Sequence, residues 1–125
     1  MAKNERRDSE IKIHVYASPR YLTVVLDDGR IFQIEPHKLG LGGHTKEEAE
    51  ALAILTSLDN FPDITEVCSD EPISGAILNT IISQIKSRRD RKRLEKLVPR
   101  IDGIKFSKIP TLENQAAIID AQTKP

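Results

Sequence analysis

The strongest constraint on the fold is an alternation of apolar and polar side chains that begins at Ile11 and has a period of two residues. Ile11, Ile13 and Val15 would lie on one side of an extended chain, with Lys12 and His14 on the other. Such alternation is typical of a half-buried β-strand, because successive side chains of a strand point to opposite faces. Residues 11–17 are therefore predicted to form a strand.

Two further strands are predicted directly after the first. Residues 21–26 are mostly β-branched or apolar, and residues 30–35 (RIFQIE) return after a turn as the third strand. Ser18, Pro19 and Arg20 form a turn signal between the first two strands, because proline fixes φ and cannot extend a ladder. Asp28-Gly29 separates the second from the third, and glycine readily takes the positive φ of a tight hairpin. The three strands should form an antiparallel meander.

Helices are predicted for the middle of the chain. Thr45 followed by Glu48 has the spacing of a capping box, so a helix is expected over about residues 45–58. Proline is tolerated in the first turn of a helix, so Pro72 favours the start of a second helix over about residues 72–97. Its apolar stripe recurs at helical spacing. The stripe consists of Ile73, Ile77, Ile81 and Ile85, with Leu78 and Ile82 alongside.

These elements predict an α+β fold, with a small antiparallel sheet of three to four strands and two main helices packed on one face. Residues 64–68 are the candidate fourth strand, and residues 103–109 form a late candidate strand. With 125 residues and 38% hydrophobic content, the chain can build one core. We expect a flexible N-terminus over residues 1–10, a single domain over residues 11–109, and a short helix and loose tail over residues 110–125.

Charge is balanced in total but segregated along the chain. The sequence has 19 basic and 19 acidic residues. Residues 45–71 hold eight acidic residues against Lys46 alone, a net charge of −7. Residues 72–125 hold eleven basic and five acidic residues, a net charge of +6. Such segregation favours either an electropositive docking face or two segments that neutralise each other.

The basic segment, residues 86–100, is the main candidate site. Cationic side chains bind phosphates and release counterions, which makes the binding dependent on salt. No aromatic residue lies between the arginines, so contact with a duplex backbone is favoured over stacking on single strands. The favoured function is a small non-enzymatic binding or regulatory protein, bacterial or from a mobile element, that docks onto a polyanion, foremost a nucleic-acid backbone. The candidate residues are Lys86, Arg88, Arg89, Arg91, Lys92, Arg93, Lys96 and Arg100.

Two other functions remain open. The first is a protein–protein adaptor, in which the basic segment meets an acidic protein surface or residues 45–71 of a second copy. The second is sequestration of a small phosphorylated ligand by a glycine-rich loop ahead of a helix, where backbone amides can cradle a phosphate. That loop would use Gly40, Gly42, Gly43 and His44.

Catalytic, metal and cofactor sites are not predicted. The histidines lack the close spacing of zinc ligands, and Cys68 is the single cysteine, which fits a reducing cytosol. Asp27 and Asp28 are explained by turn chemistry. No apolar run approaches the ~20 residues that span a bilayer, so we expect a cytoplasmic protein without a membrane partner.

Residues 21–35 resemble the opening of a family of small bacterial domains of unknown function, which pair two strands through an Asp-Gly or Asn-Gly hairpin. Residues 70–78 are similar to the acidic-serine-leucine segment that closes those domains, so the resemblance covers about residues 13–78. The chain departs from the family in lacking a tryptophan before that segment and in continuing beyond Asn79. The resemblance implies a hairpin-plus-helix fold. Some members look like operon partners or DNA-linked proteins.

Overall fold

The computed structural model describes residues 10–35 and 45–123. The chain forms a five-stranded sheet in the order β3-β2-β1-β4-β5. The predicted meander is confirmed by β1 (Ile11–Ala17), β2 (Leu22–Leu26) and β3 (Ile31–Ile34), which pair antiparallel. Gly29, in the turn between β2 and β3, has the positive φ expected of it, 98°.

The prediction of a small antiparallel sheet is wrong, because the sheet is larger and mixed. β4 (Ile64–Ser69) pairs parallel with β1, and β5 (Lys105–Lys108) pairs parallel with β4. Parallel neighbours need a crossover connection, and helices supply it here. One of them is α2 (Lys46–Asn60), which carries the chain from β3 back to the far side of β1.

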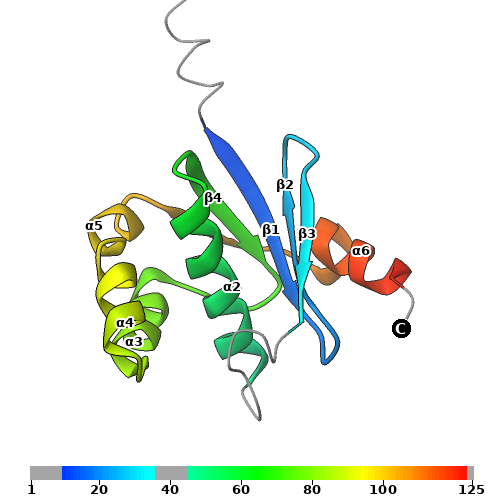
Figure 1. Ribbon diagram of the computed structural model, residues 1–125. Coiled ribbons are helices and arrows are strands. Elements are labelled where there is room, and N and C mark those ends of the chain that lie inside the picture. The colour runs from blue at the N-terminus through cyan, green and yellow to red at the C-terminus, as the bar shows by residue number, and fades with distance from the viewer. Residues whose placement is uncertain (1–9, 36–44, 124–125) are drawn as a thin grey trace, which may run out of the picture.

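The helices also cover both faces of the sheet rather than one. Figure 1 shows α2, α3 (Gly75–Gln84), α4 (Arg88–Glu95) and α5 (Val98–Ile101) on one side of the sheet. It shows α6 (Gln115–Gln122) on the opposite side, against β1 and β2. A short 3-10 helix, η2 (Thr111–Glu113), leads into α6. The first strand is therefore covered on both faces.

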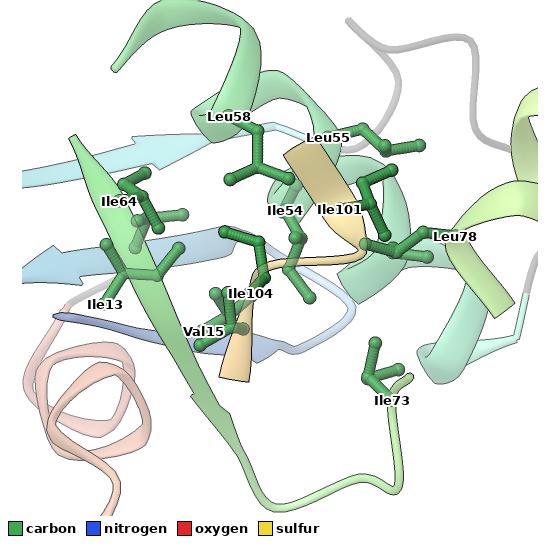
Figure 2. Packing of buried hydrophobic residues seen from close by; sticks show 14 of the residues in the cluster. Ile13, Val15, Ile54, Leu55, Leu58, Ile64, Ile73, Leu78, Ile101 and Ile104 are labelled. Carbon is green, nitrogen blue, oxygen red and sulfur yellow. The ribbon is translucent and has the colours of Figure 1, made fainter. Parts of the chain in front are cut away.

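The main core lies between the sheet and the α2 side. Ile13 and Val15 of β1 point toward Ile54 of α2 and Ile104 ahead of β5, as Figure 2 shows. Leu78 of α3 lies in the same cluster and has no exposed surface. The core is aliphatic, and its residues are almost all Ile, Leu, Val and Ala.

Helix boundaries follow from capping side chains. Thr45 and Glu48 form the predicted capping box at the start of α2. The single helix predicted over residues 72–97 is instead two helices, α3 and α4. Ile85 leaves the helical region with ψ 124°, and Ser87 caps α4 by accepting a hydrogen bond from the Asp90 amide. The break lets Leu94 turn back onto the core, where it is buried.

Candidate polyanion-binding surface

The predicted basic segment lies on α4 and its flanks. Leu94 buries one side of this helix, and the chain remains helical in geometry through its C-cap residue, Lys96. Residues four apart share one side of a helix, so Arg88, Lys92 and Lys96 line one side, with Arg89 adjacent. Ser87 fixes the start of the helix and thus the direction in which these side chains leave it.

Six of the eight predicted cations are exposed. One of these six, Arg93, forms ion pairs, and five remain. Among the described residues, none of these five side chains makes a hydrogen bond or an ion pair. We call this set the cationic surface. It consists of Lys86, Arg88, Arg89, Lys92 and Lys96.

The other three predicted cations contact their own chain. Arg91 donates to the carbonyl oxygen of Ile85 at 2.8 Å and lies 4.0 Å from Glu95. Arg93 lies 3.3 Å from Asp59, at the end of α2, and 3.5 Å from Asp90. Among the described residues, the ion pair between Arg93 and Asp59 is the one that joins the basic segment to the acidic segment, residues 45–71.

Arg100 closes the C-terminal end of α2. Its guanidinium donates to the carbonyl oxygens of Leu58 and Phe61, two groups at the last turn of that helix. Free carbonyls at a helix C-terminus need a donor, and a cation there also meets the negative end of the helix dipole. The contacts assign Arg100 to the packing of α5 against α2.

Replacing Arg100 by alanine should lower the free energy of unfolding by about 1–3 kcal/mol, because two partly buried carbonyls lose a charged donor. Lys96→Ala is the matched control. Its side chain is exposed and unpaired among the described residues, so the loss should stay within about 0.5 kcal/mol. Urea unfolding followed by circular dichroism measures both. Equal losses would contradict the structural role of Arg100.

Part of the cationic surface is unfavourable for the helix that carries it. Arg88 and Arg89 stand in the first turn of α4, at the positive end of the helix dipole, where a cation costs about 0.3–1 kcal/mol. Like charges four residues apart, such as Arg88 and Lys92, also repel each other. Lys92, in the last turn, suits the negative end of the dipole, but helix stability does not explain Arg88 and Arg89. A bound anion would relieve both repulsions.

A second polar cluster, which the sequence analysis missed, lies where β1 and β4 end. Glu50 of α2 has no exposed surface. Its carboxylate accepts hydrogen bonds from the Ala17 amide at 3.2 Å and from the Ser69 hydroxyl. Burial raises the pKa of Glu50 to about 7, although both hydrogen bonds act in the opposite direction.

Asp70, next to this cluster, has its charge balanced by Lys46. Lys46 Nζ lies 3.0 Å from Asp70 Oδ2, 3.5 Å from Glu71 and over the ring of Tyr16. Thr111 donates to the same Asp70 oxygen at 2.8 Å. The cluster thus ties α2, β1, β4 and the segment after β5 together. One signal for Glu50 was present in the sequence, since it precedes the buried residues Ala53 and Ile54 by three and four positions.

The remaining predicted site residues are Gly40, Gly42, Gly43 and His44, and they lie outside the described residues. Within residues 10–35 and 45–123, no three His, Cys, Asp or Glu side chains gather as metal ligands. Cys68 is buried, and burial, with Glu66 nearby, raises the pKa of its thiol. In the same part of the chain, no helix combines the length and apolar character needed to cross a bilayer.

Comparison with known proteins adds no relative. No family model matches the chain, and no curated protein matches it. The resemblance of residues 13–78 to small bacterial domains therefore stays a prediction.

Proposed function

We propose that the protein binds a polyanion, foremost a nucleic-acid backbone, through the cationic surface of α4, without catalysis. The observation that carries the proposal is the exposure of five cations within eleven residues, none of them paired among the described residues. Phosphate contacts by such side chains supply sequence-independent affinity. Arg91, Arg93 and Arg100 drop out of the binding set, because their guanidinium groups already contact the chain.

Contact with a duplex suits this surface better than contact with unpaired bases. Sequence-tolerant binding of single strands relies on aromatic side chains that stack on the bases. Residues 86–100 contain none. Arg88, Lys92 and Lys96, on one side of α4, instead offer a row of cations to the phosphates of a duplex backbone.

The double variant Arg88→Ala/Lys92→Ala tests the surface. Binding to a fluorescein-labelled 20-bp DNA duplex, measured by anisotropy at 50 mM salt, should weaken about tenfold or more. Each lost phosphate contact removes about 0.9 from the slope of log K against log salt, so the slope should fall by about 1.8. The fold should be unchanged, since neither side chain packs on the core.

Lys105→Ala/Lys108→Ala is the matched control, because it removes the same charge from exposed positions of β5. This variant should keep most of the affinity. The proposal fails if the wild-type chain shows no binding at 50 mM salt, or if both double variants weaken it equally.

The adaptor function is the second candidate, favoured by the Arg93–Asp59 contact between a basic and an acidic segment. The same contact made between two copies, or with an acidic partner protein, would use α4 and the end of α2. Size-exclusion chromatography at 50 and 500 mM salt separates the two functions. An assembly that forms without nucleic acid and dissolves in salt would support the adaptor.

A further inference from the structure

The C-terminal helix α6 depends on polar contacts more than on the core. Its buried apolar residues are only Ala116 and Ala117, and neither belongs to the main core cluster. Ile118 is 37% exposed. Segments with little buried apolar area open locally at a lower free energy than the rest of a domain. The polar contacts of α6 should therefore control whether it stays closed on the sheet.

The N-terminal end of α6 is held by two side chains. Asn114, which is fully buried, accepts a hydrogen bond from the Ala116 amide and donates to the carbonyl oxygen of Val15 at 3.0 Å. His14 of β1 supplies the other contact. Its Nδ1 accepts a hydrogen bond from the Gln115 amide at 3.0 Å, so one free amide of the helix start is satisfied from the sheet.

The far end of α6 has contacts of another kind. Ser18 donates to Asp120 at 2.8 Å, and Gln33 donates to the Thr123 hydroxyl at 3.1 Å. Arg20 also donates to the Asp120 carbonyl oxygen at 3.4 Å. Among these partners, only His14 has an ordinary pKa near neutrality.

We propose that His14 is a pH-sensitive latch, whose protonation releases the start of α6 from the sheet. Only the neutral imidazole has a lone pair on Nδ1, so protonation removes the acceptor of the Gln115 amide. It also places a positive charge at the positive end of the α6 dipole. Both effects favour an open α6 in mildly acidic solution.

The surroundings of His14 include charges of both signs. Burial lowers the pKa of His14, and Lys12 on the same strand lowers it further. Glu66 of β4 and Asp27 after β2 act in the opposite direction but do not reverse the shift. Cys68 is the residue of β4 paired with His14. The hydrogen bond from the Gln115 amide needs the neutral imidazole, so the closed state binds the proton less tightly than an open state does, and acid shifts the equilibrium toward opening.

Hydrogen exchange of the full chain tests the latch. Exchange of the α6 amides, divided by the rate of an unstructured peptide at each pH, should rise between pH 7.5 and pH 5. The rise is at most tenfold for each unit by which the pKa of His14 is lower in the closed state than in the open state. Amides of β1 and β4 should change less than those of α6.

His14→Gln is the matched variant, because its amide oxygen accepts a hydrogen bond and does not titrate. It should abolish the pH dependence of α6 exchange. A pH dependence that persists in His14→Gln, or is missing from the wild-type chain, overturns the proposal.

A second measurement needs no variant. In NMR spectra of the wild-type chain, the Gln115 amide shift should titrate with the same midpoint as the His14 ring. Separate midpoints, or a Gln115 shift that does not move, would also overturn the latch.

Discussion

Leu78→Ala is expected to lower the free energy of unfolding by about 2–5 kcal/mol, the range for a fully buried leucine that leaves a cavity. Leu78 has no exposed surface and lies among Ile101, Leu55 and Ile73, between α3 and the rest of the core (Figure 2). Urea unfolding with an unchanged m-value would measure a loss of stability alone.

Ile77→Ala is the control for Leu78→Ala. Both residues belong to the apolar stripe, so the sequence predicts that both are buried. In the structure, Ile77 is only partly buried and lines an open groove beside α2. Ile77→Ala should lower the free energy of unfolding by about 1 kcal/mol, since Ile77 buries less apolar surface on folding than Leu78 does. If Ile77→Ala costs as much as Leu78→Ala, the orientation of α3 described above is wrong.

Glu50→Gln is expected to gain stability relative to wild type as the pH rises. The pKa of Glu50 is about 7 in the folded chain against 4.5 ordinarily, so the folded state holds the proton more tightly than the unfolded state. The contribution of Glu50 to the unfolding free energy of the wild-type chain is therefore fully present below pH 4.5, and it is lost as the pH rises through about 7. The total loss is about 3 kcal/mol.

The measurement is the difference in unfolding free energy between Glu50→Gln and wild type at pH 5 and at pH 8. Glutamine resembles the protonated acid, so the difference should shift by about 2–3 kcal/mol in favour of the variant. His14 is common to both chains and cancels. Glu47→Gln, one turn earlier on α2, should run parallel to wild type. A constant difference for Glu50→Gln would contradict the proposed titration of the buried acid.

Local chemistry in the sequence was enough to predict the first three strands and the start of α2. Alternation at Ile11 and Ile13, the Asp28-Gly29 turn and the Thr45 capping box each act over a few residues, so a chain segment shows them without its partners. The exposed cations of α4 were also readable, because a run without apolar residues has no core to enter.

The burial of Glu50 was not predicted. Three glutamates near the start of a helix look alike in the sequence, and each suits the helix dipole. Only the position of α2 over β1 and β4 turns Glu50 inward, where the Ala17 amide and the Ser69 hydroxyl meet it. Similarly, His14 became a candidate latch only when α6 brought the Gln115 amide to it from 101 residues away.

The sequence by itself determined the elements whose signals are local: the meander, the capped helix and the cationic segment. The tertiary structure alone decided that β4 pairs parallel with β1 and β5 with β4, that α6 covers the second face, and which cations of α4 are unpaired among the described residues. The physical reason is the sequence separation of the groups that interact. Packing brings together the strands that pair in parallel and the partners of Arg93 and Arg100, and no local sequence pattern predicts those partners.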